Sequence, residues 1–559
     1  LDGIVPLENA AMEGRQVVQW DKDDCEELGL VKVDFLGLGM MAVMQDSFEM
    51  CRQRGRPTEM HKVPLDDEET FEMMRRADTI GVFQIESRAQ MATLPRFSPK
   101  DFYDVAMEVA IVRPGPIAGR LTHPLIRRRA ELEKVVYIHP SVEAAVKPIL
   151  QRTYGVILFQ EQMLEIAMVL GDFTGSQAEE LRRALGFTKG CDRLKRVIEK
   201  LEQSMRAKGL EPDVIAKVLE ATTSFAAYGF PESHAISFGL LAYVSTWLKV
   251  HRLAEFYASL LNNQPMGFYS PATLIQDGRR HGLKVKSVCV QQSEWKCTVE
   301  ADDTIRIGLL HVKGLHQTRV EAMLAARAEW RFASLDDFLA RTKFTAGERR
   351  ALASVGALQA LASHRRAALW QVEAAWSEEE SLFQAFGRGA DADVDEGVLA
   401  VGGGAASAQP TRTGADFVPL APMTRNERMQ ADFQGLQLTV GVHPMTLVRD
   451  RLPEVVRAAD LALGRDGDRV KVAGSVICRQ RPGTAKGFVF VSLEDETGIA
   501  NAVVTPDLFE RQRMVINEEA ALYIVGRLQN QDGVIHVKAE KIEALNLAEL
   551  PEQASHDFR

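Results

Sequence analysis

The chain has 559 residues, of which 46% are hydrophobic and 26% are charged, and its net charge is −10. One hydrophobic core stops growing at roughly 250–300 residues, so this length excludes a single domain and predicts three or more. The composition is that of a globular protein, and no apolar run approaches the ~20 residues that cross a bilayer, so we expect no membrane insertion.

The start of the chain and its cysteines suggest where the protein works. Leu1 stands at position 1, and neither a charged start nor an apolar centre of a secretion signal follows. We therefore expect the chain to begin inside a longer protein. The six cysteines contain no C-x-x-C pair, which leaves neither a zinc knuckle nor a disulfide framework and suits a reducing cytoplasm.

The first predicted element is a short strand within LVKVDFLGLG, residues 30–39. Val31, Val33 and Phe35 alternate there with polar Lys32 and Asp34, and two glycines end the pattern. A carboxylate beside an ammonium suits phosphoryl transfer, because Mg²⁺ prefers oxygen ligands and a triphosphate needs a cation. The alternative is an ordinary edge strand with an exposed Asp and Lys.

Helical periodicity dominates from about residue 40 to 264, with loops at Arg113-Pro114-Gly115-Pro116, 188–190 and 229–231. One long helix is predicted from about Ser233 to Leu260, with Ser233 as its cap. Residues 182–208 contain nine Lys or Arg against three Asp or Glu. This density indicates a phosphate-binding surface or a solvated helix face.

Two similar pieces lie between about residues 266 and 376, IGLLHVKGLHQTRVEAMLAA and FTAGERRALASVGALQALAS. Both place a small-residue hairpin beside helices. In helix-hairpin-helix units such a turn lets backbone N–H groups approach DNA phosphate, which makes Lys313, Gly314 and Gly356 candidate DNA contacts. The alternative is an ordinary connection between helices.

The C-terminal third changes character. Residues 377–417 are poor in aromatics and rich in Gly, Ala and Asp, which is typical of a linker. Five β-rich segments follow between 469 and 545 and predict a small barrel of the OB type. Arg479, Arg481 and Lys486 flank its first hairpin, where cations and Phe488 or Phe490 could hold single-stranded DNA. The alternative is that both phenylalanines belong to the core, and the alternation predicts that at least one does.

Several strings occur in the order found in the alpha subunit of bacterial DNA polymerase III, a C-family polymerase. After LVKVDFLGLG come GVFQIESRAQM, VAIVRPGPI, YGVILFQEQ, LRRALGFTKG and YGFPESHAISFGLLAYVSTWLKVH. The forms FPESH, QPMGFYSP and CRQRPGTAKG, with the closing SHDFR, resemble the error-prone branch of this family. The resemblance covers nearly the whole chain.

This resemblance implies a multidomain α+β fold. We expect the end of a palm in residues 1–42, mainly α-helical fingers in 43–265 and a tandem helix-hairpin-helix region in 266–376. The linker then occupies 377–417, and a C-terminal domain with the OB-type barrel occupies 418–559.

The same resemblance implies the site residues. Asp34 matches the third metal-binding carboxylate of the family, which implies Mg²⁺, and Lys32 matches a lysine close to the incoming nucleotide. Arg182 and Arg183 match paired arginines that reach the triphosphate, with Lys189 as a helper. Gln84, Glu86, Ser87 and Arg113 are expected to shape the channel or to form structural turns.

Two-metal nucleotidyl transfer needs several carboxylates around a metal pair about 3.5–4 Å apart, which one aspartate cannot hold. The family's other two aspartates and its metal-binding phosphoesterase domain lie upstream, so we expect this chain alone to be inactive. Asp21-Lys22-Asp23 and Asp391-Ala392-Asp393 have the right spacing but occupy the wrong places.

The implied function is error-prone translesion synthesis on primed DNA with deoxynucleoside triphosphates. The alternatives are the replicative alpha subunit and a non-catalytic DNA-binding module. Residues 381–387, SLFQAFG, carry only a degenerate form of the sliding-clamp motif. We therefore expect clamp contact through an accessory mutagenesis protein.

Overall fold

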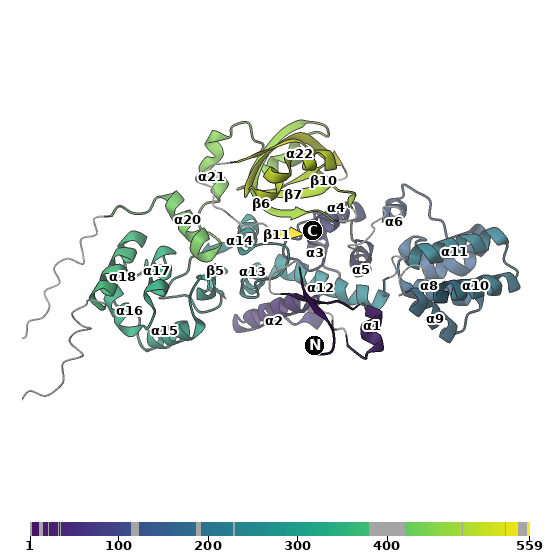
Figure 1. Cartoon of the computed structure of the whole chain (residues 1–559), viewed down its shortest axis with the longest axis horizontal. Helices are drawn as coiled ribbons and strands as arrows, with labels where there is room; N and C mark the ends of the chain where they lie inside the picture. Colours follow the sequence, from purple (N-terminus) through teal and green to yellow (C-terminus); the bar gives the residue numbers. More distant parts are fainter. Residues whose placement is uncertain are drawn as a thin grey trace, which may run out of the picture.

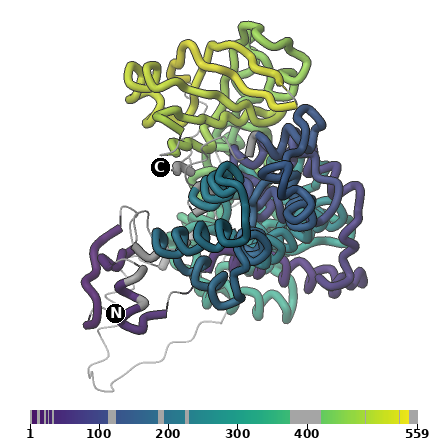
Figure 2. Tube along the Cα trace, turned by 90° about the vertical axis from the view of Figure 1, so that its right-hand side faces the viewer, coloured from purple at the N-terminus to yellow at the C-terminus, as the bar shows by residue number. Residues whose placement is uncertain are grey.

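The computed structural model describes residues 3–10, 15–20, 22–31, 33, 35–112, 122–185, 192–226, 230–379, 420–482, 485–531, 533–545 and 556–558. A central helical body carries one helical lobe on each side and the barrel on top (Figure 1). From the side, the barrel lies above the body and the N-terminal segment projects from the left side of the body (Figure 2). Separate hydrophobic clusters fill the body, the lobe formed by residues 122–226 and the barrel, as the chain length requires.

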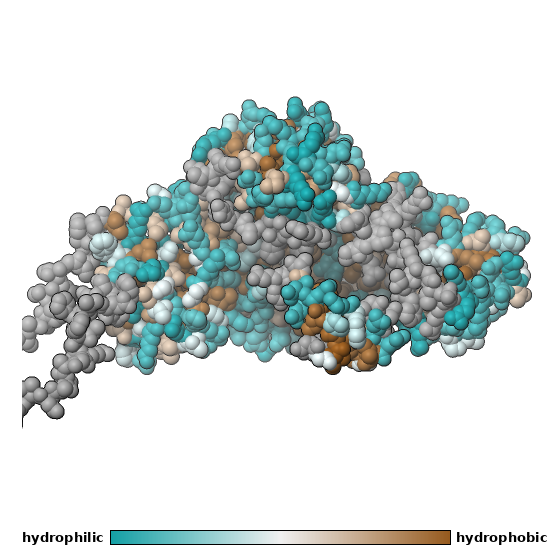
Figure 3. Space-filling view, in the orientation of Figure 1, coloured by the Kyte–Doolittle hydropathy of each residue, from teal (hydrophilic) through white to brown (hydrophobic). Residues whose placement is uncertain are grey.

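The N-terminal segment differs from the sequence prediction. It contains an antiparallel hairpin of β1 (Leu7–Asn9) and β2 (Gln16–Val18), then α1 (Lys22–Glu27). The predicted strand in 30–39 is wrong for its described residues: Val31, Val33 and Phe35 lie outside any strand and are 85%, 60% and 70% exposed. A strand needs ladder hydrogen bonds from a neighbour, and no described strand pairs with this segment. Figure 3 shows an apolar patch where the N-terminal segment lies.

The central body packs α12 against α5 and α13 against α2. A single helix from about 233 to 260 was the wrong prediction, because Arg252 has φ −137° and ψ 48° and separates α12 from α13. No side chain caps α12, whose N-cap is Pro231. The body consists of α2 (Leu38–Gln53), η1 (Met60–Lys62), α3 (Glu68–Arg75), α4 (Arg88–Phe97), α5 (Phe102–Ile111), α12 (Glu232–His251), α13 (Leu253–Asn262) and α14 (Pro271–Arg280).

The outlying lobe is built from amphipathic helices around its own core. Helix α10 buries Val197, Leu201 and Met205 at four-residue spacing, while its cations Lys195 and Lys200 are exposed. The elements are α6 (Thr122–Arg129), η2 (Pro140–Val142), α7 (Glu143–Leu150), η3 (Gln151–Thr153), α8 (Gln160–Gly171), α9 (Gly175–Leu185), α10 (Asp192–Ala207) and α11 (Pro212–Ala226).

The lobe on the other side contains the two predicted hairpins. It starts with a sheet that the sequence did not predict, with strand order β3-β5-β4, and continues with four helices. Its elements are β3 (Lys284–Lys286), β4 (Thr298–Val299), β5 (Thr304–Arg306), η4 (Leu309–His311), α15 (Gln317–Glu329), α16 (Leu335–Arg341), α17 (Ala346–Ser354) and α18 (Arg365–Glu379). The predicted linker lies outside the described residues from position 380 onward.

The C-terminal barrel is closed, because β6 pairs with both β7 and β9. Alternate residues Val489, Val491 and Leu493 point into its core. Leading into it are α20 (Arg425–Leu436), α21 (Pro444–Val448), η5 (Arg449–Arg451) and η6 (Ala458–Leu463); its own elements are β6 (Arg469–Gln480), β7 (Val489–Glu494), β8 (Ile499–Val504), α22 (Pro506–Glu518), β9 (Ala521–Gln531) and β10 (Val534–Ala544). The short β11 (His556–Phe558) adds to β6 in parallel.

The predicted fold class is confirmed: the chain is multidomain and mostly helical, with a helix-hairpin-helix region and a five-stranded barrel at the C-terminal end. Among the helices that the structure describes, none is both long and apolar enough to cross a membrane.

Candidate nucleic-acid interface

Four of the predicted site residues, Lys32, Asp34, Arg113 and Lys189, lie outside the residues that the structure describes. Arg182 and Arg183 are described, in the last turn of α9, and their side chains are 44% and 62% exposed. Both contact Glu179, with Arg182 Nη2 at 2.7 Å and Arg183 Nε at 3.2 Å from its Oε1. Hydrogen bonds from Arg182 and then Arg183 hold the pKa of Glu179 at about 2. The two arginines therefore face solvent beside one shared carboxylate.

The channel candidates Glu86 and Ser87 have internal partners. Glu86 is buried and accepts hydrogen bonds from the backbone N–H groups of Gly81 (2.9 Å) and Phe268 (3.3 Å). Burial raises the pKa of Glu86 to about 8, and these two hydrogen bonds oppose the rise. Ser87 forms a capping box with Gln90 at the start of α4. Both residues thus form the structural turn that was the alternative to a channel contact.

The first hairpin is open to solvent. Gly314 has φ +82°, and a Cβ at this position would meet no atom within 4 Å. Lys313 is exposed beside it, while its backbone N–H donates to Gly435 O at 2.8 Å. The backbone N–H of His316 donates to Glu348 Oε1 at 3.2 Å, so a carboxylate of the second unit already holds one donor of this turn. The exposed side of Gly314 is free for a phosphate to approach.

The second hairpin has a different environment. Gly356 also has a positive φ, +81°, but it is buried, and a Cβ there would come within 2.5 Å of Arg365 Nε. The Arg365 guanidinium covers the turn and donates to Asp432 Oδ1 of α20 at 2.7 Å. A DNA phosphate could reach Gly356 only if the Arg365 side chain moved away from the turn and from Asp432. The hairpin at Gly356 thus packs against α20 instead of presenting its turn to solvent.

The barrel cations also divide into internal and exposed groups. Arg479 is 9% exposed, and its Nε donates to Ile516 O of α22 at 2.6 Å, so it holds the end of that helix. Arg481 is exposed, with its guanidinium 4.4 Å from the centre of the Phe509 ring. Lys486 is exposed in the same loop.

The two phenylalanines of the barrel flank core position Val489. Phe488 and Phe490 are each partly exposed. Phe490 pairs with Val503 on the outer side of the β7–β8 ladder. The alternation of the sequence predicted that at least one of them belongs to the core; this prediction is wrong, because neither is buried.

One described cluster gathers potential metal ligands, with the ligand atoms of Asp78, Asp277 and His281 within 4.8 Å of one another. An ammonium group already occupies this cluster. Lys249 Nζ lies 3.1 Å from Asp78 Oδ1 and 2.9 Å from Asp277 Oδ2, and its side chain is fully buried. Burial alone lowers the pKa of Lys249, but Asp277 and Asp78 raise it above its ordinary value. The cluster does not fit Mg²⁺, which requires a shell of oxygen ligands without a competing cation.

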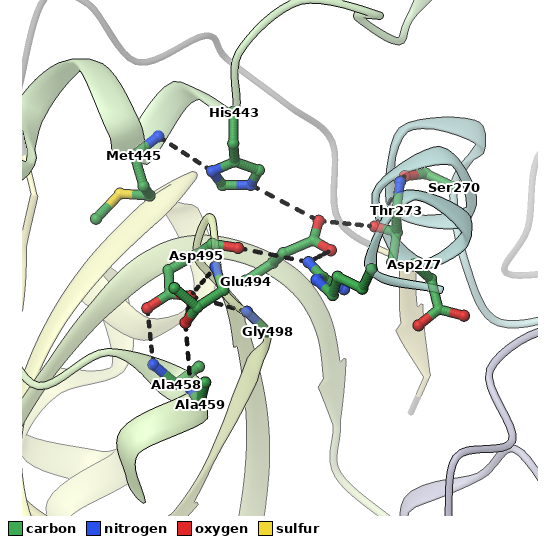
Figure 4. A network of polar contacts seen from close by, with 12 residues as sticks. Ser270, Thr273, Asp277, His443, Met445, Ala458, Ala459, Glu494, Asp495 and Gly498 are labelled. Carbon is green, nitrogen blue, oxygen red and sulfur yellow. Dashed lines mark hydrogen bonds and ion pairs between the residues drawn. The ribbon is translucent and has the colours of Figure 1, made fainter. Parts of the chain in front are cut away.

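A second polar network, which the sequence gave no reason to expect, joins the barrel to α14. Glu494, 2% exposed at the end of β7, contacts Arg280 Nη2 at 2.6 Å and accepts from Thr273 Oγ1 at 3.3 Å. His443 Nε2 approaches the same carboxylate at 4.0 Å (Figure 4). Neighbouring Asp495 accepts from the backbone N–H groups of Gly498 and Ala458, which fixes the β7–β8 turn. These contacts hold the barrel to the helical body.

Family models match in chain order. They are the bacterial DNA polymerase III alpha NTPase domain (residues 1–37), the bacterial DNA polymerase III alpha subunit finger domain (40–209), the helix-hairpin-helix motif (282–368) and the OB-fold nucleic acid binding domain (467–545). A solved asparaginyl-tRNA synthetase of Pyrococcus horikoshii is 28% identical over 18% of this chain and 27% of that chain, with a TM-score of 0.15, and supports no argument.

Curated relatives match over nearly the whole chain. The error-prone DNA polymerase of Aromatoleum aromaticum is 40% identical over 100% of this chain and 52% of its own length. Error-prone DNA polymerase 1 of Agrobacterium fabrum is 41% identical, and the error-prone DNA polymerase of Azoarcus sp. is 42% identical, each over 98% of this chain and 50% of the relative. The chain thus spans about half the length of the curated relatives it matches. It belongs to the bacterial error-prone DNA polymerases, a branch of the DNA polymerase III alpha-like C family.

Proposed function

We propose that this chain contributes to template-directed DNA synthesis by nucleotidyl transfer, and that the synthesis is error-prone translesion synthesis in the response to DNA damage. The observation that carries the proposal is the 40–42% identity to error-prone polymerases over 98–100% of the chain. The same relatives favour the error-prone enzyme over the replicative alpha subunit and over a non-catalytic binding module.

In this proposal Arg182 and Arg183 bind the triphosphate of the incoming nucleotide. Guanidinium groups remain charged and grip phosphate with two donors each. Their exposure at the end of α9 supports the role, because a triphosphate can displace the Glu179 carboxylate that they share. Lys32 and Lys189 would add positive charge, and Arg113 would line the channel.

Asp34 would hold Mg²⁺ through its carboxylate, together with further carboxylates. The metal would supply positive charge to the phosphates and would activate the attacking oxygen. Because one aspartate is too few for a metal pair, we propose that the 559 residues alone bind primed DNA without incorporating nucleotides.

DNA contacts are proposed at the exposed groups of the interface. Lys313 and Gly314 would bind a backbone phosphate at the open hairpin, and Arg481 and Lys486 would hold single-stranded template at the barrel. Gly356 and Arg479 have internal contacts in the described structure, so in this proposal they stabilise the fold and do not contact DNA. We further propose a cytoplasmic location and clamp contact through an accessory mutagenesis protein.

The test is primer extension by a protein of the relatives' full length that contains this chain. Asp34→Asn should abolish extension and leave binding of primed DNA within about twofold, because only the metal ligand changes. Asp24→Asn, in the neighbouring helix α1, is the matched control and should retain extension. Extension by the Asp34→Asn protein at the normal rate would refute the metal role.

A further inference from the structure

A cavity of about 370 Å³ lies between the start of α18, the start of α20 and the 439–442 loop. Its volume falls within the roughly 300–1,000 Å³ of small-ligand sites. Three arginines, Arg365, Arg425 and Arg428, line it together with a single acidic residue, Asp432. The lining therefore carries excess positive charge in a chain whose net charge is negative.

The acidic residue of the lining is already occupied. Asp432 is 4% exposed, and its Oδ1 accepts from Arg365 Nη1 at 2.7 Å. Its Oδ2 accepts from Thr439 Oγ1 at 2.8 Å. Burial raises the pKa of Asp432, and Arg365 and, more weakly, Arg428 oppose the rise, so this single carboxylate is shared by two of the three arginines. The side chains of Arg425 and Arg428 are exposed and have no ion pair with any residue in the described part of the chain.

Arg365 is the most buried of the three arginines, with a side chain that is 7% exposed. Its Nη1 donates to Ser354 O and Arg428 O, each at 3.3 Å, as well as to Asp432, while its Nε lies against the Gly356 turn. Arg365 therefore adds a fixed positive charge behind the exposed Arg425 and Arg428. Arg365 is also the first residue of α18, so its donors lie where that helix begins.

Two helix starts meet at this cavity. Helix α20 begins at Arg425 and α18 at Arg365, and Arg366 Nη2 joins them by contacting Glu427 Oε1 at 2.5 Å. Helix N-termini carry partial positive charge and favour anions. Glu427, in the first turn of α20, is held by Arg366 and by the capping box of Thr424. The two helix N-termini and the arginines therefore all contribute positive electrostatic potential to the cavity.

We propose that this cavity binds a phosphate group of the DNA backbone, with Arg425 and Arg428 as direct ligands and Arg365 as a buried positive charge behind them. The assignment rests on the proposed function, which makes DNA the polyanion that meets this surface. The site lies behind the hairpin at Gly356, so the second hairpin unit would contact DNA through these arginines instead of its glycine turn.

The experiment measures binding of primed DNA to the 559-residue chain by fluorescence anisotropy over a series of salt concentrations. Removing two phosphate contacts lowers the slope of log affinity against log salt by about 1.8 for duplex DNA. We expect this loss for Arg425→Ala/Arg428→Ala. The control Arg52→Ala/Arg76→Ala removes the same charge from exposed side chains on α2 and at the C-cap of α3 and should keep the original slope.

The outcomes separate the two proposals. Normal binding with an equal slope in both double variants would overturn the phosphate site and leave the proposed function standing. Failure of the unchanged chain to bind primed DNA would overturn both. Tripolyphosphate is added in a thermal-shift arm, because a variant that loses only tripolyphosphate protection and keeps the DNA slope would show a small phosphate compound as the ligand and refute the backbone assignment. Equal melting temperatures without ligand establish that the variant is folded.

Discussion

Arg280 Nη2 lies 2.6 Å from Glu494 Oε1, and this ion pair joins α14 of the helical body to β7 of the barrel. The two side chains are 20% and 3% exposed, so the contact is largely shielded from water. Burial raises the pKa of Glu494 to about 7, and Arg280 opposes the rise. The barrel is thus fixed to the body by an ion pair, and the charged form of Glu494 depends on Arg280.

Arg280→Ala should destabilise the protein by about 3–5 kcal/mol, because it leaves Glu494 buried without its cation. Urea unfolding, together with limited proteolysis between body and barrel, measures the effect. The double variant Arg280→Met/Glu494→Leu removes both charges and should recover much of the loss. A double variant as unstable as the single one would show that packing, not the unpaired carboxylate, causes the effect.

Glu108→Gln should abolish one pH dependence of stability. Glu108 is fully buried in α5, neither carboxylate oxygen has a hydrogen-bond partner in the described part of the chain, and burial raises its pKa from 4.5 to about 8. Between these values the folded chain holds a proton that the unfolded chain has lost, so the free energy of unfolding falls as pH rises. Glutamine does not titrate, so the free energy of unfolding of the Glu108→Gln chain does not fall for this reason as pH rises.

Urea unfolding at pH 5, 7 and 9 checks this prediction. The advantage of Glu108→Gln over the unchanged chain should grow from pH 5 to 9, whereas Glu69→Gln on the exposed face of α3 should show no such trend. A constant difference at all three pH values would contradict a titrating Glu108.

The two hairpin glycines should respond differently to substitution. Gly356→Ala places a methyl group within 2.5 Å of Arg365 Nε, whereas Gly314→Ala meets open space. Both glycines have positive φ, which costs an alanine roughly 1–2 kcal/mol. The melting temperature should therefore fall further for Gly356→Ala than for Gly314→Ala. The Gly314→Ala chain should lose DNA affinity, and its stability should fall only by the cost of the positive φ. Equal melting temperatures would refute the difference in packing.

Arg182→Ala should raise the nucleotide concentration needed for half-maximal primer extension by about tenfold or more, since a charge-assisted hydrogen bond contributes roughly 1.5–3 kcal/mol. Binding of primed DNA should change little. Steady-state kinetics of a full-length protein measure this, with Arg206→Ala on the exposed face of α10 as the matched control. An equal effect of both substitutions would identify a general charge effect instead of a triphosphate contact.

The sequence alone determined the features that arise from neighbouring residues. Alternating apolar residues predicted the barrel strands. The glycine in Val312-Lys313-Gly314-Leu315 predicted the open hairpin. Both predictions were possible because side-chain periodicity and the conformational freedom of glycine depend on only a few neighbouring positions. Ordered motifs from 30 to 251 gave the family, which the relatives then confirmed.

Only the tertiary structure decided which charges are internal. Arg280 and Glu494 are 214 positions apart, and Lys249 and Asp78 are 171 apart, so no local pattern could pair them. The same holds for Arg365 beneath Gly356 and for Arg479 beside α22, the second of which the sequence predicted as a DNA contact. A local pattern fixes which way a backbone turns, but whether a charged side chain meets water, a carboxylate or a carbonyl depends on which distant segment packs over it.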